Sequence, residues 1–305
     1  MRQTLIISDV HGNQPALTAV LRHVYRYYKP DEIWCLGDIA GYGPHTEPVW
    51  KALRNLLIPP GGWVAGNHDC GLIGRLNGPR ILKSLDLPGA SGINPQIEYR
   101  ISHFRELAWA VLEKQKELLS NKPELLSHLG SLPLMSSPRL GVYLAHGSFI
   151  KETLGSVLEY TNHLIVSPSG MVENFRHAAQ NKPKDIYQGD ITTDSLPRLF
   201  AFGHTHIPAL WRWSPDKNQE WRSLNYKWPH RLGNLDESPL ALNPGSVGFP
   251  RSGTGCPTYA LIDWEKGIVF FRQVRYDPTE TLRDMGVPPY SDLLAEPGFW
   301  LPPAC

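Results

Sequence analysis

The stretch Leu36-Gly37-Asp38-Ile39-Ala40-Gly41 decides the fold of this chain. It follows the apolar run of residues 32–35, which is typical of a short buried strand. A glycine and a carboxylate at the end of such a strand place a ligand site at the rim of a parallel sheet, where open α/β sheets bind their ligands. Because a carboxylate has two oxygens, we expect Asp38 to bridge two cations.

The segments around this stretch alternate between strands and helices. Residues 4–8 and 63–65 are predicted as strands. A helix is predicted after Asn13, which is expected to cap it, and a second helix is predicted around residues 49–57. This alternation predicts right-handed βαβ units and a largely parallel sheet in the first part of the chain.

Beyond residue 70 we expect two insertions and an antiparallel second half. Residues 71–139 and 149–197 are predicted as helical insertions over the sheet rim. Four of the ten tryptophans lie in residues 211–228, where they could stack on a nucleobase, but a hairpin with its own aromatic cross-strand pairs is favoured. Helices are predicted at residues 103–119, 123–129 and 171–180. Strands are predicted at residues 140–145, 199–202, 209–213, 240–242, 259–262 and 268–271, the last two as a hairpin.

The composition excludes several classes of protein. The 305 residues carry 30 lysines and arginines against 29 aspartates and glutamates, so the whole chain has no field that attracts nucleic acid or a membrane. No apolar run approaches transmembrane length, and the start of the chain does not resemble a signal peptide. The four cysteines are scattered, which favours a reducing compartment. We therefore expect a cytoplasmic protein without a membrane partner and without a strong sign of nucleic-acid binding.

Metal-ligating residue types follow five predicted strands. Each of them, taken alone, is more often a turn residue, a cap or an ordinary buried histidine. Carboxylate, imidazole and amide donors without thiolate favour Mn, Fe, Zn or Ni over a soft-metal site. The joint order of the donors along the chain favours a metal centre. The donors are Asp9, His11, Asp38, Asn67, His68, His146, His204 and His206.

The ordered motifs Asp-x-His, Gly-Asp-x-x-x-x-Gly, Gly-Asn-His-Asp, His-Gly and Gly-His-Thr-His resemble those of the calcineurin-like metallophosphoesterases. Residues 243–251 also look like a turn found in the small bacterial and archaeal phosphodiesterase branch. That turn could present backbone donors to a phosphate, although a purely structural turn is favoured. The resemblance implies an α/β fold: a two-sheet sandwich with helices on both outer faces and helical insertions at the sheet rim. It predicts a metallophosphoesterase domain over residues 1–275, followed by a proline-rich C-terminal tail over residues 276–305.

The resemblance also implies a role for each donor. His68 would be the general acid that protonates the leaving group, while a hydroxide that bridges two divalent ions attacks a phosphodiester in line. Asn13 is a candidate for substrate contact or for supporting a ligand, and Arg251 is a candidate substrate contact. Asp9, His11, Asp38 and His206 would hold one ion. Asp38, Asn67, His146 and His204 would hold the other.

Two departures from related motifs reduce the number of activities that we expect. In protein serine/threonine phosphatases the second motif continues with an aspartate and an arginine, where this chain has Gly41 and Tyr42. Their absence argues against a dedicated phosphoprotein phosphatase, unless the insertions supply replacements, and against a diadenosine tetraphosphatase of similar motif type. Hydrolysis of a small phosphodiester is favoured over phosphomonoesterase or protein serine/threonine phosphatase activity. A protein-binding scaffold on the same fold is the alternative from another class, but His68 and every ligand position are filled, which favours an enzyme.

Overall fold

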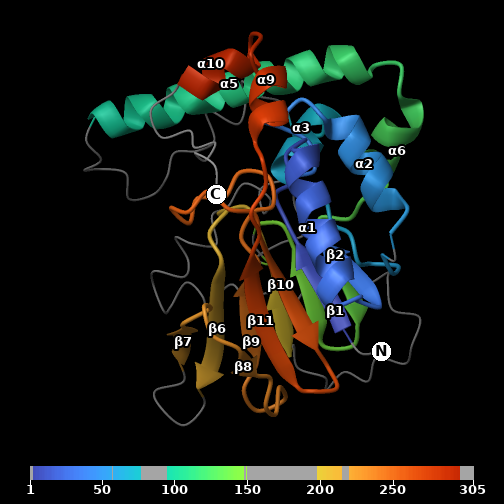
Figure 1. The fold of residues 1–305 in the computed structure, drawn as a ribbon, viewed down its shortest axis with the longest axis vertical. Coiled ribbons are helices and arrows are strands. Elements are labelled where there is room, and N and C mark those ends of the chain that lie inside the picture. Colours follow the sequence, from blue (N-terminus) through green and yellow to red (C-terminus); the bar gives the residue numbers. More distant parts are fainter. Residues whose placement is uncertain are drawn as a thin grey trace.

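The chain folds into two mixed β-sheets with flanking helices (Figure 1). The computed structural model describes residues 3–56, 58–76, 95–147, 149, 198–214 and 220–295, without the side chains of residues 95–105 and 220. The first sheet has the order β2-β1-β10-β11-β8 and the second β3-β4-β5-β9-β6-β7. The strands of the first sheet are β1 (Gln3–Ile7), β2 (Glu32–Cys35), β8 (His230–Arg231), β10 (Thr258–Asp263) and β11 (Ile268–Gln273). Those of the second are β3 (Met135–Arg139), β4 (Val142–Ala145), β5 (Leu199–Ala201), β6 (Ala209–Ser214), β7 (Glu220–Leu224) and β9 (Leu240–Asn243).

The parallel pairing predicted for the first part of the chain is confirmed between β1 and β2, whereas the prediction of an antiparallel second half is wrong in part. In the first sheet β1 pairs in parallel with β2 and antiparallel with β10. In the second sheet β4, β5 and β9 are parallel neighbours, whereas β6 returns antiparallel to β9. The strand predicted at residues 63–65 is reduced to one bridge between Cys35 and Trp63, because Ala65 already donates its N–H to Pro133.

The helices lie mainly beside the first sheet and at one end of the molecule (Figure 1). Asn13 caps the first helix by accepting a hydrogen bond from the backbone N–H of Ala16, as predicted. The helical pattern of residues 103–129 is also confirmed, while the helix predicted at 171–180 lies outside the described residues. The helices are α1 (Gln14–Tyr27), α2 (Thr46–Arg54), α3 (Asn67–Leu72), α5 (Pro95–Leu119), α6 (Pro123–Ser131), α9 (Thr279–Asp284) and α10 (Tyr290–Ala295).

The alternation of apolar side chains along the strands divides the core into layers. Leu5 and Ile7 of β1 pack with the buried faces of α1, α2 and α6, while Ile6 points the other way into the layer between the two sheets. On the second sheet, Trp213 of β6 stands opposite Trp221 of β7, with ring centroids 5.8 Å apart, which confirms the predicted aromatic hairpin.

The proline-rich tail adds two short helices that the sequence did not predict. Met285 precedes α10, and it packs with Tyr290 and Leu293 against Tyr42 and Phe249, close to the loops that carry the donors. The tail is therefore part of the wall around the site. Among the described helices, none combines the length and apolarity needed to cross a membrane. Cys35 and Cys70 are buried free thiols, whereas Cys256 is disulfide-bonded.

Candidate metal centre

The predicted donors meet at one edge of the two sheets, and most of them have an unusual backbone. Because a left-handed backbone costs a residue other than glycine about 1–3 kcal/mol, these conformations must be held in place by the surrounding structure. They bend the chain as it leaves a strand, so that the side chain turns into the site. The donors with positive φ are Asp9 (54°), His11 (47°), Asp38 (53°), His204 (68°) and His206 (60°).

The first donor cluster consists of Asp9, His11 and His206, which are all buried. Each offers a ligand atom, and these atoms lie within 4.8 Å of one another. The Nε2 atoms of His11 and His206 are 3.0 Å apart, and Oδ1 of Asp9 lies 3.3 Å from Nε2 of His206. This spacing lets one ion touch all three side chains.

The second cluster consists of Asp38, His146 and His204, whose ligand atoms again lie within 4.8 Å of one another. Nε2 of His146 is 3.2 Å from Oδ2 of Asp38 and 3.1 Å from Oδ1 of Asn67, so the amide oxygen faces the same space. Oδ2 of Asp38 is also 3.6 Å from Nε2 of His11 in the first cluster. Asp38 thus lies between the two clusters.

Backbone carbonyls fix the orientation of three of the imidazoles. Nδ1 of His11 donates to Ala40, that of His146 donates to Leu36, and that of His206 donates to Phe249, at 2.9, 2.7 and 2.5 Å. A carbonyl only accepts, so Nδ1 must carry the proton in each ring. In the neutral form of each ring Nε2 then keeps its lone pair and points into the site, as in metal-binding histidines.

Several features of the site fit a bound cation. The lone pairs of His11 and His206 face each other at 3.0 Å, which is repulsive unless a positive charge lies between them. Oδ1 of Asp9 is buried and makes no hydrogen bond, while Oδ2 accepts the N–H of His204. An orphaned carboxylate oxygen beside two bare imidazole nitrogens is a donor set for Mn, Fe, Zn or Ni.

Residues 2–267 match the family model of the calcineurin-like phosphoesterase superfamily domain. The chain belongs to the calcineurin-like phosphoesterase superfamily. This confirms the family predicted from the motifs, together with the two-sheet α/β fold.

Relatives of this phosphoesterase align over most of its length. An uncharacterized protein of Methanocaldococcus jannaschii is 28% identical over 276 residues, covering 89% of this chain and 87% of the relative. A symmetrical bis(5'-nucleosyl)-tetraphosphatase of Wigglesworthia glossinidia brevipalpis is 21% identical over 225 residues, covering 70% and 74%. Among solved structures, a metallophosphoesterase from Sphaerobacter thermophilus has a TM-score of 0.64 at 27% identity, covering 96% of this chain and 98% of the other.

Burial and charge divide the imidazoles of the phosphoesterase into two kinds. Burial keeps the pKa values of His204 and His206 well below the ordinary value, helped by the neighbouring charges of His146 and Arg251 respectively. Both rings are therefore neutral and able to bind metal. Burial also opposes the charged form of His146, but the Asp38 carboxylate outweighs it and raises the pKa of His146 to about 9. His146 must therefore lose a proton before its Nε2 can bind a metal ion.

His68 stands at the edge of the second cluster. Its backbone N–H donates to Oδ1 of Asp38 at 2.8 Å. A ring nitrogen of His68 lies within 4.8 Å of ligand atoms of Asp38 and His11. Nδ1 of His68 is buried and has no hydrogen-bond partner among the described residues. A Cβ at Gly41 would lie 2.3 Å from Nδ1, so the ring packs directly against the backbone of the glycine.

The two candidate substrate contacts have different surroundings. Asn13 is fully buried, and its amide is engaged on both sides: Nδ2 donates to Gly248 and Tyr276, while Oδ1 accepts from Ala16 and Thr281. This arrangement places Asn13 as a residue that fixes the loop rather than as a phosphate contact. Arg251, in contrast, is exposed, and its Nη2 donates to the Tyr42 hydroxyl at 3.3 Å.

The turn at residues 243–251 is structural, as favoured from the sequence. Its N–H groups at Val247 and Gly248 donate to Ser8 and Asp9, and that of Arg251 donates to His206. These donors are therefore committed to the loops of the site. A Cβ at Gly248 would lie 1.9 Å from the carbonyl oxygen of Val10, so only glycine allows this close approach.

Asp69 is a buried residue whose role the sequence did not reveal. Its carboxylate accepts four backbone N–H groups: those of Asp38 and Gly66 on Oδ2, at 2.8 and 3.0 Å, and those of Ile39 and Ala40 on Oδ1, at 3.0 and 3.1 Å. It thereby fixes the backbone around Asp38. The available signal was an acidic residue three positions after the N-cap of α3, which is typical of a capping box.

Gln115 of α5 supports the same loop from the other side. Its amide donates to the carbonyls of Gly41 and Gly43 and accepts from the N–H of Gly41 and the hydroxyl of Thr46. The helical insertion therefore takes part in positioning the metal loop. No motif marks a glutamine in the middle of a long amphipathic helix, so the sequence offered no signal for it.

Proposed function

We propose that this phosphoesterase hydrolyses phosphodiesters with a pair of divalent ions. The observation that supports the proposal is the position of Asp38, whose carboxylate lies between two clusters of ligand atoms. When bound, such ions supply a nucleophilic water at neutral pH and offset the charge of the phosphate. Asp9, His11, Asp38 and His206 would hold one ion, and Asp38, Asn67, His146 and His204 the other.

His68 is proposed as the acid that protonates the leaving oxygen. In the free site burial lowers the pKa of His68 to about 3, so the ring is neutral at pH 7. A phosphate placed beside it adds negative charge and raises that pKa, so we infer that the ring gains its proton together with the substrate. Nδ1 has no carboxylate partner, which would otherwise hold the proton permanently.

The surroundings of Tyr42 support a diester over a monoester. A monoester dianion calls for strong cationic contacts, yet the position of the phosphatase arginine is taken by Tyr42, which is buried against His11 and His68 at ring distances of 4.4 and 4.6 Å. Arg251, whose guanidinium reaches the Tyr42 hydroxyl, is the proposed substrate contact. One arginine matches the single negative charge of a diester.

Hydrolysis of bis(5'-nucleosyl) tetraphosphates is a second candidate. It is favoured by the relative from Wigglesworthia glossinidia brevipalpis, which aligns over 70% of this chain. The Gly41 and Tyr42 positions argue against it, as they do for monoesters. Both activities use the same cluster of donors, so a comparison of substrates decides between them.

The deciding experiment compares substrates on one preparation. The protein is stripped with a chelator, reloaded separately with Mn²⁺, Zn²⁺, Ni²⁺ or Fe²⁺, and assayed with bis-p-nitrophenyl phosphate, p-nitrophenyl phosphate and diadenosine tetraphosphate. We expect metal-dependent hydrolysis, with kcat/KM at least about tenfold higher for the diester than for the monoester. His230→Gln, a histidine on β8 far from the donors in sequence, serves as the control for loss of an imidazole.

Two results would overturn the proposal. A higher kcat/KM for the monoester or for the tetraphosphate would assign the site to another substrate class. Absence of hydrolysis with every metal, despite two bound ions per chain, would instead favour a protein-binding scaffold on the same fold.

A further inference from the structure

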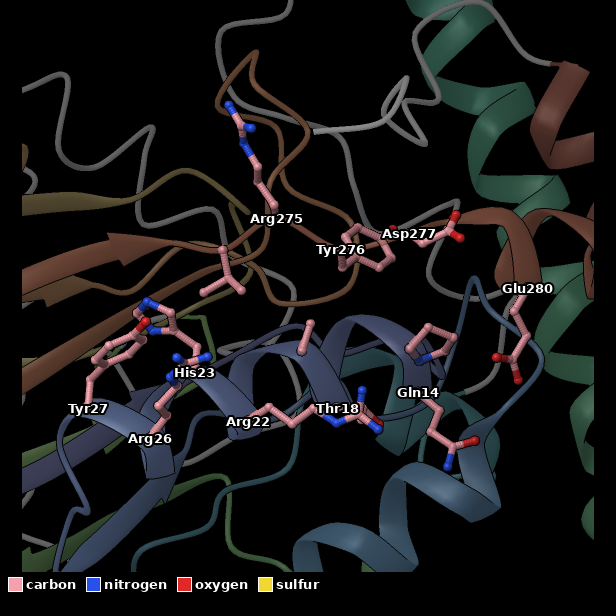
Figure 2. Close-up of a pocket in the computed structure, with 13 residues that line it drawn as sticks. Gln14, Thr18, Arg22, His23, Arg26, Tyr27, Arg275, Tyr276, Asp277 and Glu280 are labelled. Carbon is pink, nitrogen blue, oxygen red and sulfur yellow. The ribbon is translucent and has the colours of Figure 1, made fainter.

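A groove of about 590 Å³ lies between α1 and the segment that follows β11 (Figure 2). Its volume falls within the range of small-molecule sites. Figure 2 shows Arg22, Arg26 and Tyr27 on the α1 wall, while Arg275 rises from the opposite wall. None of the metal donors lines this groove, so it is separate from the candidate metal centre.

Three arginines give the groove a positive charge that no described carboxylate pairs with. Arg22, Arg26 and Arg275 are exposed, and none of them forms an ion pair with another described residue. The acidic residues that line the groove, Asp277 and Glu280, stand at the end away from Tyr27 (Figure 2). In a chain with a net charge of +1, three arginines free of carboxylate partners around one groove are a local anion site.

An aromatic surface lies beside these arginines. The ring of Tyr27 is 59% exposed, stands 4.9 Å from the ring of His23, and has the guanidinium of Arg26 at 5.4 Å from its centroid. Nδ1 of His23 is engaged with the Tyr259 hydroxyl. Burial lowers the pKa of His23, so its ring contributes aromatic surface rather than charge.

We propose that this groove binds a nucleotide, with the phosphates on Arg22 and Arg26 and the base against Tyr27. Guanidinium groups bind phosphate oxygens in bidentate fashion, and an exposed tyrosine ring offers a stacking face for any base. Arg275 adds positive charge on the opposite wall, although its side chain extends away from α1 (Figure 2). Arg26 and Tyr27 lie in the last turn of α1, where the backbone N–H groups are already bonded within the helix. The affinity for phosphate must therefore come from the arginine side chains.

A hydrogen bond links the groove to the loop that carries the first metal motif. Tyr276 lines the groove, and its hydroxyl accepts a hydrogen bond from Asn13, which caps α1 directly after the first metal motif. A nucleotide in the groove would therefore lie next to Tyr276 and Asn13 without touching the metal donors. The groove is inferred from its own residues and does not depend on the substrate proposed above.

The test measures ADP binding to the full-length protein, before and after chelation, by titration calorimetry and with a fluorescent N-methylanthraniloyl ADP. We expect one equivalent of binding that persists after chelation. Arg22→Ala and Arg26→Ala should each weaken it by about tenfold or more, the usual effect of losing a charge-assisted contact. Tyr27→Ala should weaken it similarly, and Tyr27→Phe should keep it within about threefold because the ring remains.

Arg231→Ala is the matched control, since Arg231 is an exposed arginine on β8 with no ion pair to a described residue. It should leave ADP affinity unchanged. The proposal is overturned if ADP does not bind after chelation, or if Arg231→Ala weakens binding as much as Arg26→Ala. Insensitivity to Tyr27→Ala would also overturn it, because a simple anion site would then suffice. Binding of a single-stranded oligonucleotide more than tenfold tighter than ADP through the same arginines would assign the groove to nucleic acid instead.

Discussion

Replacing Asp69 by alanine tests whether the Asp69 carboxylate fixes the backbone of Asp38. The carboxylate of Asp69 accepts the backbone N–H groups of Asp38, Ile39, Ala40 and Gly66, and all of these groups are buried. In the alanine variant the four donors lose their acceptor. The loop that carries Asp38 is then expected to relax, and its strained backbone at Asp38 (φ 53°) has less to hold it.

The magnitude follows from two opposing effects. At about 2 kcal/mol for each buried N–H left without a partner, four donors cost about 8 kcal/mol. Burial and the charge of Asp38 raise the pKa of Asp69 to about 6, roughly two units above the ordinary value. Removing this unfavourable charge returns about 3 kcal/mol. The cost of the unsatisfied N–H groups exceeds the gain from removing the charge. The free energy of unfolding is therefore expected to fall by about 5 kcal/mol, a large share of typical domain stability.

The assay is urea unfolding at pH 8 in the presence of chelator, so that loss of metal does not contribute to the difference. Asp69→Asn retains one acceptor oxygen and should lose about half as much as Asp69→Ala. Asp292→Ala removes an exposed carboxylate on α10 and should change little. Metal content after reloading should fall in Asp69→Ala. A loss below about 1 kcal/mol with normal metal content would refute the reasoning, because water would then satisfy the loop equally well.

The sign of the pH dependence gives a second check on Asp69. Its pKa in the folded protein is raised to about 6, above the ordinary value near 4, so the folded state takes up this proton more readily than the unfolded state. Wild-type stability relative to Asp69→Ala should therefore increase as the pH falls from 6 to 4.

Three other predictions concern the metal donors. Asp38→Ala should reduce the metal content below two ions per chain by mass spectrometry, and two retained ions would rule out a bridging role. His68→Gln should lower kcat by about 10²–10⁴-fold with metal content unchanged; loss of metal instead would make His68 a ligand, as its distance to the His11 and Asp38 donors allows. The Asp38 carboxylate overcomes the effect of burial and raises the pKa of His146 to about 9, so the stability that this proton gives the metal-free protein should be lost as the pH rises from 6.5 to 9. Metal binding should release this proton, and metal affinity should increase over the same pH range. Calorimetry in buffers of different ionisation enthalpy measures the number of protons released, and a value of zero would contradict the prediction.

The positions of the donors could be predicted because they depend on local patterns. Apolar runs locate the strands, and donors placed directly after Ile7, Cys35, Ala145 and Ala201 fall just beyond strand ends in the structure. Neighbouring strands bring such positions to one edge. The cap at Asn13 was predictable for the same reason, since it depends on residues within one helical turn.

The pairing of the later strands could not be predicted, because it joins residues far apart in the chain. β10 pairs with β1 across some 250 residues, and its apolar pattern does not specify which strand it will meet. The supports of the site were missed for a different reason. Asp69 and Gln115 bind backbone N–H and carbonyl groups, which every residue offers, so their partners leave no trace in the sequence.

The backbone of the donor loops is held by contacts other than those to an ion. Strained residues such as Asp9 and His11 persist only where other contacts over-determine them. The N–H of Asp9 donates to Gly37, its carbonyl accepts from Ser246 and Gly248, and the N–H of His11 donates to Asp38. The loops thus hold one another through contacts that need no metal ligand. An ion that binds there should not have to order the loops, so little of its binding energy is spent on folding them.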